Sequence, residues 1–179
     1  MRRFMSVLLA LLLAIIMVGG GVLPPVAPVS ATGVQVSLNA PTEVLPGSSF
    51  TATVNISQVV DLNGAQYDIV VDPTVLTVDN VTAGQIGATV MPVQGFTLVS
   101  PGRYRVLQSL MEPPYTVNGT GYLAVLHFRV IGSLGNSSAI SLDNGILSGW
   151  EAEIPATWIG DSVEVAVSPG DANGDGVVN

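Results

Sequence analysis

The 179-residue sequence contains no cysteine, no lysine and a single histidine. These absences exclude disulfide bonds, catalysis by a cysteine nucleophile and Schiff-base chemistry on a lysine. Serine catalysis would depend on His127 alone, and no pattern brings two carboxylates together in the way that a glycosidase requires. The sequence therefore predicts a protein that is not an enzyme.

Positive charge is also scarce. After residue 31 the only cationic side chains are Arg103, Arg105 and Arg129, against thirteen carboxylates, so this part of the chain has a formal charge near −10. Phosphate-rich partners would be repelled by such a surface. The composition therefore argues against nucleic acid and against an anionic membrane surface as partners.

Long apolar runs are absent except at the N-terminus. Arg2 and Arg3 precede an apolar run from Val7 to Val18, and the stretch that follows ends in the small residues Ser30 and Ala31. This order is typical of a secretory signal peptide, and the run is short for a membrane span. We expect residues 1–31 to be removed, leaving a secreted protein, extracellular or associated with the cell surface; an uncleaved anchor is the alternative.

Helical spacing of apolar residues is nowhere evident beyond this segment. Instead, apolar residues alternate with polar ones in runs such as VQVSLN (34–39), FTATVNIS (50–57) and AQYDIVV (65–71), as in half-buried strands. Further strands are expected near 75–82, 96–99, 103–110, 121–131, 139–142, 145–149 and 162–167. Turn signals separate them: Pro46-Gly47-Ser48, Asn63-Gly64, Asp72-Pro73, Pro101-Gly102, Asn118-Gly119, Gly135-Asn136 and Asn144-Gly145. Nine or ten short strands without helices predict an all-β antiparallel sandwich.

The tail, SPGDANGDGVVN (168–179), has the spacing of a calcium loop of the EF-hand type. Its expected oxygen ligands are Asp171, Asn173, Asp175, the carbonyl of Val177 and Asn179. The carboxylate required at position 12 and a following helix are missing, so calcium binding by this piece would be weak or absent. The alternative is an acidic, glycine-rich linker.

Taken together, these segments resemble two known families. GDANGDGVVN looks like the opening of a dockerin, a calcium-binding module, so we expect the chain to be cut inside the first dockerin loop. Residues 32–167 resemble a cohesin domain in the order PGSSFTATVNIS, GAQYDIVVDPTVLTVDNV, GYLAVLHFRVIG, AISLDNGIL and DSVEVAV. The resemblance implies a jelly-roll sandwich of nine strands, in agreement with the strand pattern.

The resemblance also implies where a partner binds. In cohesins a sheet face that includes the strand before the Asp-Pro turn receives the dockerin helices. In this sequence that strand presents Gln66, Asp68 and Val70 on one face, so these residues are expected to face the partner; ordinary solvated strand residues are the alternative. Arg103 and Arg105 share a face of another strand and would pair either with acidic groups of the partner or with carboxylates of the chain itself.

The function implied is that of an extracellular, non-catalytic scaffolding module, linked to polysaccharide degradation, whose partners are dockerin-bearing proteins or further copies of this chain. The alternative is a carbohydrate-binding or adhesive sandwich. It would require exposed aromatic residues, for which Trp150 and Trp158 are candidates. Packing of these two residues in the core or at an edge is the competing interpretation.

Overall fold

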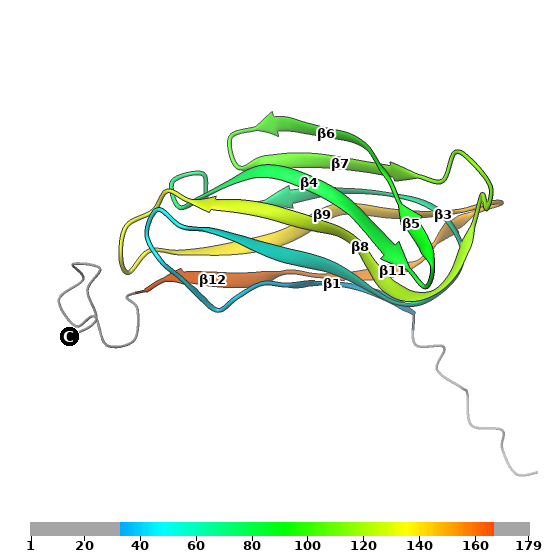
Figure 1. Cartoon of the computed structure of the whole chain (residues 1–179), viewed down its shortest axis with the longest axis horizontal. Helices are drawn as coiled ribbons and strands as arrows, with labels where there is room; N and C mark the ends of the chain where they lie inside the picture. Colours follow the sequence, from blue (N-terminus) through cyan, green and yellow to red (C-terminus); the bar gives the residue numbers. More distant parts are fainter. Residues whose placement is uncertain (1–32, 167–179) are drawn as a thin grey trace, which may run out of the picture. The chain divides into compact units, whose positions relative to one another are not determined.

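The computed structural model describes residues 33–166, which form twelve strands and no helix (Figure 1). The strands are β1 (Val34–Asn39), β2 (Glu43–Val44), β3 (Ser49–Val70), β4 (Leu76–Ile86), β5 (Thr89–Met91), β6 (Val93–Ser100), β7 (Arg103–Ser109), β8 (Val117–Val130), β9 (Ser137–Gly149), β10 (Glu153–Ile154), β11 (Ala156–Ile159) and β12 (Asp161–Val165). The predicted all-β sandwich is confirmed.

The strands form two layers that share the long strand β3. The first part of β3 pairs with β1 and β8, and β4 and β5 continue that sheet beyond β8, while β11 adds a parallel strand beside β1. The second part of β3 pairs with β7 and β9, and this sheet extends through β6 on one side and through β12 and β2 on the other. We call these the first and the second sheet.

Apolar side chains at alternate strand positions fill the space between the sheets. The core takes Val54, Leu126 and Phe128 from the first sheet and Tyr67 and Leu147 from the second, each at most 1% exposed. Because alternate residues of a strand point to opposite faces, the remaining residues of the second sheet form an outer face. This outer face is the surface on which the sequence places its candidate site.

A buried polar side chain connects the two sheets. Gln108 of β7 is 4% exposed, and its Nε2 donates hydrogen bonds to the carbonyl oxygens of Leu123 on β8, at 2.7 Å, and Met91 on β5, at 3.1 Å. The Tyr67 hydroxyl donates to Gln108 Oε1 at 3.4 Å, and burial raises the pKa of Tyr67. Within residues 33–166 every buried side-chain nitrogen and oxygen has a partner.

Three predicted turns are wrong. Asn63-Gly64 lies within β3, Asn118-Gly119 within β8 and Asn144-Gly145 within β9, so the strands expected at 50–57 and 65–71 are one strand, as are those at 139–142 and 145–149. Each pair lies at or beside a shift in strand register. The residues that permit turns here permit bulges, because both need unusual backbone angles.

The other turn signals are correct. The chain turns between strands at Pro46-Gly47-Ser48, Asp72-Pro73, Pro101-Gly102 and Gly135-Asn136. In the second of these, Asp72 Oδ1 accepts hydrogen bonds from the Thr74 amide, at 2.8 Å, and from the Thr74 hydroxyl. These bonds lower the pKa of Asp72, the side-chain bond being the larger cause.

Candidate partner-binding face

The outer face of the second sheet carries a row of three side chains centred on Gln66. Leu107 of β7 and Ile146 of β9 stand opposite Gln66 in the strand register. Leu107 is 42% exposed and Ile146 39%, so both apolar side chains are open to solvent on this face. Registered neighbours on one face lie close together, so the row presents an amide between two apolar side chains.

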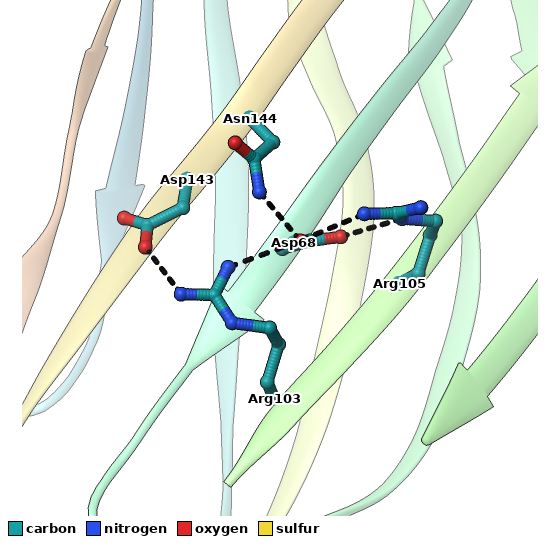
Figure 2. A network of polar contacts seen from close by, with 5 residues as sticks. All are labelled: Asp68, Arg103, Arg105, Asp143 and Asn144. Carbon is teal, nitrogen blue, oxygen red and sulfur yellow. Dashed lines mark hydrogen bonds and ion pairs between the residues drawn. The ribbon is translucent and has the colours of Figure 1, made fainter. Parts of the chain in front are cut away.

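The next row contains a network of ion pairs centred on Asp68 (Figure 2). Arg105 donates to both carboxylate oxygens of Asp68, from Nε at 2.7 Å and from Nη2 at 3.0 Å. Arg103 bridges two carboxylates, donating from Nη1 to Asp68 at 3.0 Å and from Nη2 to Asp143 at 2.8 Å. The Asp68 side chain is only 1% exposed because these partners cover it.

A bulge in β9 supplies the fourth donor to Asp68. Gln66 is opposite Ile146 and Asp68 is opposite Asp143, so β9 has one residue more than β3 between these pairs. Asn144 lies in this bulge with a φ of 50°, and its Nδ2 donates to Asp68 Oδ2 at 2.8 Å. The left-handed angle, which asparagine tolerates, thus directs an amide toward the carboxylate.

These contacts determine the electrostatics of the face. The hydrogen bond from Arg105 is the largest cause that holds the pKa of Asp68 below its usual range, and the bonds from Asn144 and Arg103 act in the same direction, against the effect of burial. The pKa of Arg103 is raised, first by Asp143, and that of Arg105 by Asp68. Two arginines and two aspartates make the network neutral in an otherwise acidic molecule.

The structure places the predicted residues on one face but in different environments. Gln66 and Val70 are half-buried on the outer face, whereas Asp68 lies beneath the arginines. Of the two alternatives for Arg103 and Arg105, internal salt bridges are formed, and the two side chains remain 29% and 40% exposed.

Sequence reasoning missed several residues of this face: Leu107, Asp143, Asn144 and Ile146. Leu107 follows Arg103 and Arg105 at the same alternation, so the strand period would have placed it on their face. The hydrogen bond from Asn144 to Asp68 depends on the bulge in β9. The sequence signal at Asn144-Gly145 predicts a turn there and not a bulge.

The two tryptophans differ. Trp158 is partly buried, and its ring lies 5.6 Å from that of Tyr67, centroid to centroid, at the edge of the core. Trp150 is 61% exposed and lies 5.8 Å from the ring of Tyr115. The competing interpretation of core or edge packing therefore holds for Trp158, and Trp150 stays available to a ligand.

The predicted calcium ligands Asp171, Asn173, Asp175, Val177 and Asn179 lie outside the described residues, as does the predicted signal peptide, residues 1–31. Between residues 33 and 166 no group of three or more metal-ligating side chains is present. The same range contains no helix that is long and apolar enough to cross a membrane. The calcium site stays a prediction.

The two packed layers define the protein as a β-sandwich module. The Cohesin domain family model matches residues 34–165, so the chain belongs to the cohesin family. Cohesins are non-catalytic protein–protein interaction modules, and the prediction that the protein is not an enzyme is confirmed by this membership. No curated protein matches the chain significantly.

Solved structures support the same fold. A non-cellulosomal cohesin from the archaeon Archaeoglobus fulgidus is 18% identical, with a TM-score of 0.63 over 75% of this chain and 91% of that one. A cohesin module from a Clostridium perfringens family 33 glycoside hydrolase is 14% identical, with a TM-score of 0.64 over 75% and 97%. The sixth cohesin of scaffoldin B from Acetivibrio cellulolyticus, solved with a Cel5 dockerin, is 20% identical, with a TM-score of 0.59 over 75% and 99%.

Proposed function

We propose that this protein recruits dockerin-bearing proteins through the outer face of β6, β7, β3 and β9. Membership of the cohesin family supports the proposal, as does the similar fold of a cohesin solved in complex with a dockerin. The observation that carries it is the exposed row of Leu107, Gln66 and Ile146 beside a network of charges that is already neutralised.

This arrangement suits a partner helix with apolar side chains. Protein interfaces gain most of their affinity from a small desolvated centre surrounded by polar groups. Leu107 and Ile146 supply apolar surface at the centre, and the Gln66 amide between them offers both a donor and an acceptor. The guanidinium groups of Arg103 and Arg105 are partly exposed at the rim and would donate hydrogen bonds to carboxylate or carbonyl oxygens of the partner.

The proposal also includes export of the protein, a link to enzyme assembly and pairing between copies of the chain. The predicted signal peptide supports export, and the usual role of cohesins supports a link to the assembly of polysaccharide-degrading enzymes. The dockerin-like tail supports pairing between copies of this chain, in which calcium would order the partner loop. Calcium would then act on the dockerin side of the complex and not on the cohesin face.

Titration calorimetry tests the proposal. The protein would be titrated with a panel of dockerins, including one whose first calcium loop begins with GDANGDGVVN, in calcium and then in chelator. We expect tight binding to at least one dockerin that disappears with chelator. The failure of every folded dockerin to bind in calcium would reject the proposal.

Matched variants locate the interface. Leu107→Asp and Ile146→Asp place a charge at the centre of the face and should weaken binding about a hundredfold, because the charge must lose its water on docking. Leu134→Asp is the control, since Leu134 is 53% exposed in the turn between β8 and β9. Equal losses in all three variants would contradict the assignment of the interface.

Direct binding of polysaccharide is a second candidate function. The observation that favours it is the exposure of two neighbouring aromatic rings, Tyr115 and Trp150, at one end of the sandwich.

A further inference from the structure

Tyr115 and Trp150 form an exposed aromatic pair. Their ring centroids lie 5.8 Å apart with 47° between the ring planes, and the side chains are 47% and 61% exposed. Within residues 33–166 they are the only exposed aromatic side chains, since the others are buried or half-buried. Neighbouring exposed apolar side chains of this size mark a candidate site for ligand contact.

The middle of β3, where its pairing passes from the first sheet to the second, holds both aromatic residues in place. Asn63 Nδ2 donates a hydrogen bond to the Tyr115 carbonyl at 2.7 Å, and the Trp150 amide donates to Asp61 Oδ2 at 3.3 Å. The Asp61 amide in turn donates to Asn118 Oδ1. Two segments far apart in the sequence are thus attached to residues 61–63, so the backbones that carry the rings are ordered before any ligand binds.

The aromatic pair lines an open hollow of ≈ 460 Å³, together with Asp61, Pro114, Thr116 and Glu151. Besides the two aromatic side chains, the polar side chains in this lining are two carboxylates and one hydroxyl, and no cation is among them. The arginines of the described strands are paired with aspartates elsewhere. An anionic ligand would therefore be repelled, whereas ligand hydroxyl groups would find acceptors.

We propose that this hollow binds a neutral polysaccharide chain, with sugar rings lying against Trp150 and Tyr115 and their hydroxyl groups donating to Asp61 and Glu151. A pyranose ring with equatorial hydroxyls has a flat apolar face that stacks on an aromatic ring. Its hydroxyl groups, at the ring edge, reach the carboxylates that flank the pair. This site rests on the second candidate function and is separate from the row of Leu107, Gln66 and Ile146.

The test uses the whole protein and two neutral probes, the hexasaccharides of β-1,4-linked glucose and of β-1,4-linked xylose. Binding is followed by tryptophan fluorescence and by calorimetry. Trp150→Leu keeps an apolar side chain but removes the flat ring, and we expect affinity to fall about tenfold. Trp150→Phe keeps a ring and should lose about threefold or less.

Met111→Ala is the matched control. Met111 has no ring, is 71% exposed and lines a second hollow, which shares Pro114 with the hollow of the aromatic pair. It should bind the saccharides as the parent protein does. Tyr115→Leu should lose affinity in the same direction as Trp150→Leu. A loss in Trp150→Leu that Trp150→Phe restores identifies stacking as the source of affinity.

Three results would overturn the inference. These are no binding of either hexasaccharide by the folded protein, equal binding by the parent and Trp150→Leu, or preferential binding of tetramethylammonium ions that salt abolishes. The last would assign the hollow to a cation. Dockerin titrations on the same preparations separate the two proposals, because each set of variants should leave the other ligand unaffected.

Discussion

Asp68 and Arg105 form a two-point ion pair across neighbouring strands, with Arg105 Nε and Nη2 lying 2.7 and 3.0 Å from the two carboxylate oxygens of Asp68. The arginine side chain is 40% exposed and the aspartate only 1%. The arginine therefore covers a carboxylate that the strand pattern directs outward. Although Asp68 lies on the outer face, its carboxylate is thus buried and accepts hydrogen bonds from Arg103, Arg105 and Asn144.

The first prediction concerns the stability of this network. Asp68→Asn should lower the free energy of unfolding by about 2 kcal/mol, because it leaves two guanidinium groups side by side without their shared carboxylate. Urea unfolding followed by circular dichroism measures the change. Asp79→Asn is the control: Asp79 pairs with Arg129 where both are well exposed, 42% and 56%, so the loss there should be below about 0.5 kcal/mol.

The second prediction is a dependence of stability on pH. The pKa of Asp68 is depressed in the folded state. As pH falls through the ordinary aspartate pKa of about 3.9, the unfolded chain therefore binds more protons than the folded protein. The stabilisation from Asp68 is fully present above that value and is lost as pH falls toward the folded-state pKa. Urea titrations between pH 6 and 2.5 should show a steep decline for the parent and a shallower one for Asp68→Asn. Equal slopes would contradict the pKa assignment.

The third prediction concerns the polar bridge inside the core. Gln108→Leu should destabilise the protein by about 2 kcal/mol, since the Tyr67 hydroxyl and two carbonyl oxygens lose a buried partner. Thermal and urea unfolding would measure this loss. Gln94→Leu removes an exposed glutamine of β6 and should change stability by less than about 0.5 kcal/mol. If Gln108→Leu were neutral or stabilising, the bridge would have no structural role.

The fourth prediction concerns the contact of Gly145 with Trp158. A Cβ at residue 145 would collide with the Trp158 ring, so Gly145→Ala must displace the tryptophan. We expect destabilisation of about 1–3 kcal/mol and a change in near-ultraviolet circular dichroism. In Gly95→Ala the added Cβ would meet Leu107 at an ordinary 3.5 Å, and this control should leave both measurements nearly unchanged.

Much of the fold was predictable because it depends on local alternation. The runs around Val36, Val54 and Ile69 alternate as half-buried strands and have become β1 and the two parts of β3. The signals at Asn63-Gly64 and Asn144-Gly145 were misread as turns. Left-handed or irregular backbone serves a turn and a bulge equally well, and only pairing with neighbouring strands decides which forms.

The sequence by itself determined the all-β class, the absence of catalytic chemistry and the face that carries Gln66, Asp68 and Val70. These follow from composition and from a period of two, which are properties of the chain alone. The tertiary structure decided that Asp68 is buried beneath Arg103 and Arg105 and that Tyr115 lies beside Trp150. Both arrangements bring together residues at least 35 positions apart, and such contacts depend on the register and order of strands that no local pattern encodes.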